Sequence, residues 1–440
     1  MTSPHPRLVL QVVERLCGDK QFWEKLQPPG TVFCRHRIYT LAVVVRLMLV
    51  QRLLEGGSLS QAVQRFVQGR DGLAPGPGPG AISLRTGAYC RARQKLPTLV
   101  AIQVLDAIVE RLQGWLPSHP ILADRPVFVV DGSTLPLPPT AELKKAYPPC
   151  HNQHGQSHWP ILRMVVLQDA QTGLALRPHW GPLNGPRAVS EQQLVLQAMD
   201  QLPPQAVVLG DRNIGVFGVA WAAHQHNHPV LLRLTRQRAQ RIGSLTGPPD
   251  QAVVWRPTRW DLCGGPLDSP AALPGRLLCV TSADSQQPEP FYFFTTLDLP
   301  AEQIFQLYGL RWNVETDLRS IKRTVQLQQL TGRSEAMLQK ELYLAIAAYN
   351  LVRAVICLAA ERIQVSPRRL SFTNVFTLLE TFLPDLSAAT TPAAWNTCWD
   401  RIIQLATSYV LPNRTKPRSY PRYVWRKSSG FPFYKAPKLK

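Results

Sequence analysis

Residues 308–322 read Tyr308-Gly-Leu-Arg311-Trp-Asn-Val-Glu315-Thr-Asp-Leu-Arg-Ser-Ile-Lys322. On a helix that turns about 100° per residue, Arg311, Glu315 and Lys322 fall roughly 60°, 20° and 40° behind Tyr308. A second, apolar stripe lies beside them: Leu307, Leu310, Val314, Leu318 and Ile321. The pattern predicts a helix that buries its apolar stripe and presents one carboxylate among cations and a phenol. Such a face suits an anionic ligand, and a solvated charged face is the alternative.

The composition indicates a globular protein with a polyanionic partner. The chain has 440 residues, of which 45% are hydrophobic and 18% charged, enough for a core divided among two or three domains. A formal net charge of +20 and a pI near 10.0 favour nucleic acid over an anionic membrane surface. We expect no membrane span, because polar and charged residues interrupt the apolar runs at 41–54 and 342–360.

The eight cysteines form no CxxC pairs, as is usual for reduced intracellular thiols. One cluster contains Cys150, His151, His154 and His158. Its spacing matches no common zinc site, and the neighbouring prolines predict a loop. We expect a polar loop whose histidines can approach phosphate, and zinc binding stays open.

The N-terminal part is expected to be helical, with segments near 7–17, 38–55, 58–69 and 98–115 and an N-cap at Ser58. A Gly/Pro tract at 74–80 predicts a flexible connection. The segment that follows forms a short basic helix with Arg91, Arg93 and Lys95. We expect this helix either to contact DNA or to be a solvated face.

From residue 125 the pattern changes to alternating strands and helices. Strands are predicted at 127–130, 161–167, 174–180, 206–209 and 230–234, and helices at 190–202, where Ser190 and Gln193 suit a capping box, and 216–226. Three antiparallel strands followed by alternating helix and strand are typical of ribonuclease H-like cores. Residues 236–296 break the alternation, and short strands at 253–255, 276–280 and 291–295 predict a β-rich insertion. Further helices are expected at 340–362, 368–382 and 392–409.

The segment from Arg414 to the end is basic and aromatic. It contains nine Lys and Arg residues, Arg422, Arg426 and Lys427 among them, and no acid. Its proline and aromatic content disfavours a regular helix. We expect an extended arm that follows DNA phosphates, and a disordered tail is the compatible alternative.

Two aspartates share a context that suggests a site. Asp131 and Asp211 each follow a buried apolar strand and adjoin a glycine, and strand ends are where sites gather in α/β sheets. Taken singly, each is more often a turn former or a helix cap. Together with Glu315 they would form a group of three carboxylates, whose mutual repulsion favours hard divalent cations such as Mg²⁺. Two such ions could support an in-line phosphoryl displacement.

These residues resemble a known family. Asp131-Gly-Ser-Thr, Gly-Asp211-Arg-Asn and Tyr308-x2-Arg311-x3-Glu315-x6-Lys322 are similar to the DDE transposases of bacterial insertion sequences, in the group defined by the YREK signature (insertion-sequence family four). All four residues of that signature match at the expected spacing. Supporting similarity covers most of the chain, including residues 88–96, 231–235 and 349–353.

The resemblance implies roles for these residues. Asp131, Asp211 and Glu315 would be the catalytic metal ligands, binding two Mg²⁺ ions that Mn²⁺ could replace, while Tyr308, Arg311 and Lys322, with neighbouring Arg319, would bind DNA phosphates. In relatives that cleave through a hairpin, a tryptophan of the insertion receives a flipped base. Trp255 and Trp260 are the candidates here, and core packing is the alternative for each.

The fold class expected is therefore α/β, with a ribonuclease H-like catalytic core interrupted by a β-rich insertion. The predicted regions are an N-terminal helical DNA-binding region at 1–120, the core at 121–235 and 297–365, the insertion at 236–296, a C-terminal helical region at 366–413 and the basic tail at 414–440. The expected function is cut-and-paste DNA transposition, with terminal inverted repeats and target DNA as partners. We also expect a homodimer in the synaptic complex and a cytoplasmic, nucleoid-associated location. A metal-dependent nuclease that cuts without joining, or an inactive DNA-binding element protein, is the alternative.

Overall fold

A computed structural model describes residues 38–54, 57–68, 83–115, 121–122, 125–152, 155–258, 272–280, 290–325, 327, 330–389 and 391–412. The chain divides into two compact units, Met1–Val410 and Leu411–Lys440. All the helices and strands that follow belong to the first unit. The expected helix near 7–17 lies outside the described residues.

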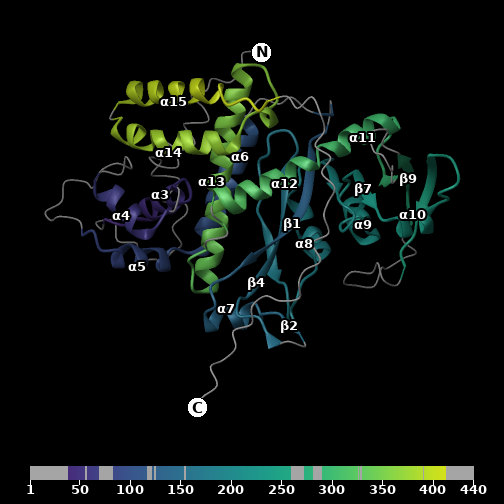
Figure 1. Cartoon of the computed structure of the whole chain (residues 1–440), viewed down its shortest axis with the longest axis horizontal. Coiled ribbons are helices and arrows are strands. Elements are labelled where there is room, and N and C mark those ends of the chain that lie inside the picture. The colour runs from purple at the N-terminus through teal and green to yellow at the C-terminus, as the bar shows by residue number, and fades with distance from the viewer. Residues whose placement is uncertain are drawn as a thin grey trace. The chain divides into compact units, whose positions relative to one another are not determined.

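A mixed eight-stranded sheet forms the centre of this unit (Figure 1). Its strands, in spatial order, are β5 (His179–Pro182), β4 (Ile161–Asp169), β1 (Val127–Pro136), β6 (Val207–Gly210), β7 (Val230–Leu234), β10 (Phe291–Thr295), β9 (Leu273–Val280) and β8 (Asp250–Trp255). β1, β4 and β5 pair antiparallel, and β6 and β7 continue parallel to β1. The remaining pairs, from β7 to β8, are antiparallel. The expected α/β class is therefore confirmed.

Two strands differ from their predicted extent. β1 does not end at Val130 but continues to Pro136, because residues 131–136 pair with β4, Asp131 opposite Val166. The strand expected at 174–180 is reduced to one bridge at Ala175, and β5 begins only at His179. The register shifts by one residue in between, since Ala175 lies opposite Gln168 but His179 lies opposite Val165. On the edge away from β4, the Asn350 side chain accepts from Ala175 N and donates to Ala175 O, both at 2.8 Å. The side-chain amide replaces a neighbouring strand there.

The three strands of the predicted insertion extend the central sheet. β10 pairs with β7 in the register Phe293 opposite Arg233, and β9 and β8 follow at the edge. The apolar faces of β7 and β10 are buried, as expected for interior strands. A separate two-stranded sheet joins β2 (His151–Asn152) to β3 (Gly155–Gln156).

Most of the predicted helices are present. The observed helices are α3 (Leu41–Arg52), α4 (Leu59–Val67), α5 (Gly87–Lys95), α6 (Thr98–Trp115), α7 (Ala141–Ala146), α8 (Glu191–Ala198), α9 (Phe217–Gln225), α10 (Arg236–Ile242), α11 (Ala301–Gly309), α12 (Trp312–Arg319), α13 (Glu335–Arg362), α14 (Phe372–Ala388) and α15 (Pro392–Ala406). Of these, α7, α10 and most of α11 were not predicted. The caps at Ser58 and Ser190 are confirmed, each as a capping box. Such boxes satisfy backbone N–H groups that would otherwise lack partners at the first turn.

The long helix α13 is the core of the helical part. It contacts α3 and α6 from the N-terminal side of the chain and α14 and α15 from the C-terminal side (Figure 1). By length and composition α13 could cross a bilayer, but 89% of its apolar window is buried inside the protein. A helix that is apolar all round and enclosed in this way is a core helix.

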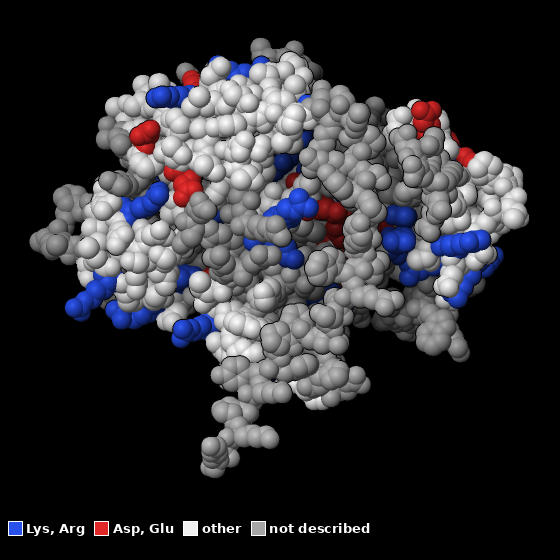
Figure 2. Space-filling view, in the orientation of Figure 1, with Lys and Arg blue, Asp and Glu red and all other residues white. Residues whose placement is uncertain are grey.

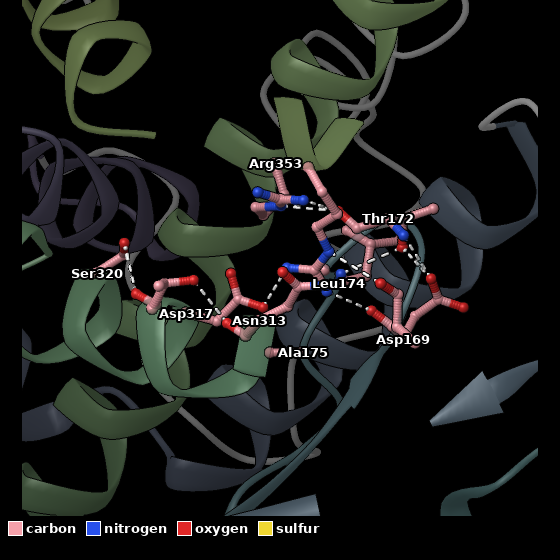
Figure 3. A network of polar contacts seen from close by, with 12 residues as sticks. Asp169, Thr172, Leu174, Ala175, Asn313, Asp317, Ser320 and Arg353 are labelled. Carbon is pink, nitrogen blue, oxygen red and sulfur yellow. Dashed lines mark hydrogen bonds and ion pairs between the residues drawn. The ribbon is translucent and has the colours of Figure 1, made fainter. Parts of the chain in front are cut away.

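Polar side chains of α13 and the segment after it bind the turn between β4 and β5. Tyr349 Oη donates to Gly173 O at 3.0 Å, and Arg353 Nε donates to Thr172 O at 2.7 Å. Arg368 Nη2 donates to Asp169 O at 2.9 Å and, through Nη1, forms an ion pair with Asp317 of α12. Figure 3 shows Asp317 near this turn, with Arg353 above it. The network fixes α12 to the sheet.

We predict that Asp317→Ala lowers the free energy of unfolding by about 3–5 kcal/mol, because it leaves Arg368 as an unpaired buried charge. The Asp317 and Arg368 side chains are only 5% and 13% exposed. Chemical denaturation measures this loss. The double variant Asp317→Ala/Arg368→Ala should lose less than the sum of the two single changes; additive losses would show that the two side chains are not coupled.

Candidate functional site

The segment 308–322 is divided rather than one continuous helix. α11 ends at Gly309, Leu310 and Arg311 form a turn, and a π-helical segment (Ser320–Thr324) follows α12. Arg311 N donates to Tyr308 O, only three residues back, at 3.0 Å. The single helical face expected from Tyr308 to Lys322 is therefore wrong, and low helix propensity at Gly309 favours the break.

The turn nevertheless brings three of the motif residues together. The Arg311 guanidinium carbon lies 5.8 Å from the centre of the Tyr308 ring, and its Nη2 lies 2.9 Å from Glu315 Oε1. The Arg311 side chain is 8% exposed and that of Glu315 41%. Arg311 is thus an inner cation, and Glu315 is partly open to solvent. Lys322 lies half-buried in the π-helical segment, and Arg319 is exposed.

Tyr308 is more deeply placed than the sequence suggested. It is 4% exposed and packs against Phe293 of β10, with ring centres 4.7 Å apart. Burial raises the pKa of its hydroxyl, and the neighbouring Arg311 and Arg233 act in the opposite direction. The Tyr308 hydroxyl is buried in this conformation, and its contact with a DNA phosphate stays a prediction.

Asp131 and Asp211 lie at the end of the β1–β6 pairing. The last parallel pair is Val129 with Leu209, so both aspartates follow it by two residues. Gly132 N donates to Asp131 Oδ1 at 2.8 Å. Asp211 Oδ1 accepts from Asn213 N at 2.8 Å and from Ile214 N at 3.1 Å. Asp211 is therefore a turn former, which was the alternative interpretation of this residue. It also lies close enough to Asp131 for the two charges to interact.

Sequence analysis missed one carboxylate of this group, Glu191. It is the first residue of α8, and its charge acts on Asp131 together with that of Asp211. Asn213 Nδ2 donates to Glu191 Oε2 at 2.5 Å. The only available signal was a Glu directly after the N-cap of a predicted helix, which by itself indicates favourable helix-dipole interaction.

The carboxylates disturb one another electrostatically. Burial, Asp211 and Glu191 raise the pKa of Asp131 to about 6, while the Gly132 N–H and Arg311 act against the rise. Burial and Asp211 raise the pKa of Glu191, offset in part by Asn213 and Arg163. Negative charge is thus only partly balanced by these cations. Figure 2 shows acidic side chains in a hollow near the centre of this face, with basic side chains on both sides.

The donor chemistry fits a hard divalent cation, since Asp131, Asp211 and Glu191 supply carboxylate oxygens here. The geometry is not closed around an ion, however. Within the described residues, no three His, Cys, Asp or Glu side chains are close enough to hold a metal ion together. Glu315 instead forms the ion pair with Arg311. Binding of metal by all three motif acids would therefore need Glu315 to move.

Of the basic helix residues, Arg93 lies in the interior. It is 6% exposed, and its guanidinium pairs with Glu341 of α13 at 2.5 Å, so it stabilises the interior. Lys340 supports the same packing, since its Nζ donates to the Arg93 and Gln94 carbonyls at 3.1 and 3.0 Å. Arg91 and Lys95 are exposed on α5 and stay predicted DNA contacts.

Trp255 lies in the core. It is 5% exposed and packs against Phe217 and Phe294, with ring centres 5.8 and 4.8 Å away, so its alternative interpretation as a core residue is confirmed. The other candidates that lie outside the described residues are Trp260, Arg422, Arg426, Lys427 and His154. Cys150, His151 and His158 are exposed.

Comparisons with known proteins agree with the motif. Residues 122–351 match the family model for the transposase DDE domain. The chain is 25% identical over 418 residues to the transposase InsG for insertion sequence element IS4 of Escherichia coli (strain K12), covering 92% of this chain and 90% of that protein. A crystal structure of endonuclease V from Bacillus subtilis covers 47% of this chain and 80% of its own at 16% identity, with a TM-score of 0.21. That score is too low to equate the two folds.

We predict that Asp131→Asn stabilises the metal-free protein at pH 7 by about 1–3 kcal/mol. The pKa of Asp131, about 6, lies above the value of about 4 in an unfolded chain. The folded state therefore binds the extra proton between these values, and stability falls as pH rises through this window. Unfolding in EDTA should show the gain at pH 7 and its loss below about pH 4. A constant gain at both pH values, or the same gain for Glu302→Gln on the exposed start of α11, would contradict the assignment.

Proposed function

The chain belongs to the family of transposases with a DDE domain, and from this membership we propose that it catalyses cut-and-paste transposition of an insertion sequence. In the proposed reaction the enzyme nicks DNA at terminal inverted repeats and joins the resulting 3′ ends to target DNA. The observation that supports the proposal best is the gathering of Asp131, Asp211 and the Arg311–Glu315 pair from elements far apart in the sequence.

The proposed catalytic core is ribonuclease H-like. Its support is the antiparallel arrangement of β1, β4 and β5, followed by the parallel strands β6 and β7 with intervening helices. In this view residues 121–235 and 297–365 form the core, 236–296 the insertion, 1–120 an N-terminal helical DNA-binding region, 366–413 a C-terminal helical region and 414–440 the tail. The inserted strands would then act as an extension of the core sheet.

Membership of this family implies dependence on a divalent metal ion. We propose two Mg²⁺ ions, which Mn²⁺ could replace, held by Asp131, Asp211 and Glu315. Bound metal ions lower the pKa of a water or hydroxyl nucleophile and stabilise the leaving oxygen. The protein's part is to bring the acids to one place and to keep Glu315 available on α12.

The cations next to the acids would bind and orient the DNA. Arg311 neutralises Glu315 in the free protein and also acts on Asp131. When Glu315 turns towards the two aspartates, the Arg311 guanidinium is released for a phosphate, which suits its planar set of donors. Lys322 and the exposed Arg319 would extend this contact along the strand.

The substrate implies the remaining partners. Terminal repeats and target DNA carry the negative charge that a net charge of +20 favours. Pairing of two element ends would need two active sites, so we propose a homodimer in the synaptic complex. As a bacterial element protein it would work in the cytoplasm on nucleoid DNA.

We predict that Asp131→Ala, Asp211→Ala and Glu315→Ala each abolish nicking and joining, because each removes a proposed metal ligand, while binding of element ends stays within about twofold of the native protein. Gel assays with element-end DNA measure binding and nicking, and pre-cleaved ends with a plasmid target measure joining. Glu302→Ala, an exposed carboxylate at the start of α11, is the control and should retain all activities.

These assays also separate the alternatives. Nicking without joined product would make the protein a nuclease. Binding without either reaction would make it an inactive DNA-binding protein. Activity that persists in the three alanine variants would refute the assignment of the acids.

We predict that deletion of residues 414–440 weakens DNA binding and flattens its salt dependence. The segment carries nine basic residues and no acid, and each phosphate that a tail residue neutralises contributes about 0.9 to the slope of log K against log salt. Binding isotherms at several salt concentrations measure the slope. An unchanged slope would remove the tail from the DNA contacts.

A further inference from the structure

Glu191 is fixed in place by the start of α8. Ser190 Oγ accepts from Gln193 N at 3.1 Å, and Gln193 Oε1 accepts from Ser190 N at 2.8 Å. This capping box determines where the helix begins. The box makes Glu191 the first helical residue and places its carboxylate next to Asp131 and Asp211.

One oxygen of Glu191 lies against β1. A Cβ atom built on Gly132 would lie only 2.3 Å from Glu191 Oε1 and 2.4 Å from its carboxyl carbon. The carboxylate therefore occupies the space that a side chain at position 132 would fill. Gly132 N, which donates to Asp131 Oδ1, is also within reach of the Glu191 carboxylate.

The other oxygen binds the turn after β6. Asn213 Nδ2 donates to Glu191 Oε2 at 2.5 Å, and Asn213 N donates to Asp211 Oδ1 at 2.8 Å. The two residues that Glu191 contacts, Gly132 and Asn213, are thus the ones whose backbone N–H groups hold Asp131 and Asp211. The Glu191 carboxylate thus contacts both Gly132 of β1 and Asn213 in the turn after β6.

We propose that Glu191 is a positioning residue of the transposase site, which sets the separation and orientation of Asp131 and Asp211 through Gly132 and Asn213. This inference rests on the proposed function of the two aspartates. A glutamine could accept the Asn213 hydrogen bond without adding a third negative charge to the group, so the bond to the turn alone does not account for a glutamate here. Partners that orient metal-binding carboxylates typically change metal affinity about 10- to 100-fold when removed.

The test compares Glu191→Ala with Gln192→Ala in the full-length protein bound to element-end DNA. Gln192 is the control for the turn itself, because its Nε2 donates to Asn213 O at 2.7 Å and to Asn213 Oδ1 at 3.3 Å without bringing a carboxylate to Gly132. Electron paramagnetic resonance of free Mn²⁺ gives metal affinity directly, and the Mn²⁺ concentration for half-maximal nicking gives a second measure. We expect Glu191→Ala to weaken both about 10- to 100-fold and Gln192→Ala to leave both unchanged.

Two further variants separate positioning from charge and from folding. Gly132→Ala displaces the Glu191 carboxylate without removing it and should weaken Mn²⁺ binding as Glu191→Ala does. Glu191→Gln keeps one acceptor for Asn213 and should lie between the native protein and Glu191→Ala. If Glu191→Ala does not fold, these two variants, checked by their melting temperatures, decide the matter.

The outcomes are distinct. Native Mn²⁺ affinity in Glu191→Ala and Gly132→Ala, or an equal loss in Gln192→Ala, would overturn the positioning role. If the native protein neither nicks nor joins DNA, the proposed function fails instead. If it does both, and Asp131→Ala does neither, a null result for Glu191 refutes the inference alone.

Discussion

The arrangement of the site depends on the buried ion pair between Asp317 and Arg368. Arg368 also donates to the Ala170 and Asp169 carbonyls, each at 2.9 Å, so it connects α12 to the turn after β4. Buried charges need such pairing, because an isolated one would cost several kcal/mol. Asp317 lies two residues from Glu315, on the inward side of α12. The pair therefore determines where the helix places its exposed acid relative to β1.

Much of this was accessible from the sequence because the signals were local. Capping boxes at Ser58 and Ser190 depend on residues three positions apart, and buried strands such as Val230–Leu234 have short apolar runs with clear ends. The spacing of Asp131, Asp211 and Glu315 was informative through its resemblance to a family. In the structure Asp131 and Asp211 lie near each other, because both follow the last pair of the β1–β6 pairing.

The sequence failed where a distant partner decided the outcome. Arg93 was predicted as a surface cation, but it is buried and pairs with Glu341, 248 positions away in the sequence. A one-residue shift in register with β4 reduced a predicted strand to a bridge at Ala175. Gly309 allowed a break that periodicity treats as continuous, and Phe293 covered Tyr308. Glu191 was not predicted as part of the site for the same reason, since only the fold brings the start of α8 next to the ends of two strands.

The pairing of β10 with β7 has a mechanical consequence. Because Phe293 lies opposite Arg233 in the β10–β7 pairing, the outer strands β9 and β8 continue the same hydrogen-bonded sheet as β7 and β6 without a break. A load on β8 or β9 would therefore reach β7 and β6 through the hydrogen bonds between neighbouring strands, and the turn that holds Asp211 directly follows β6.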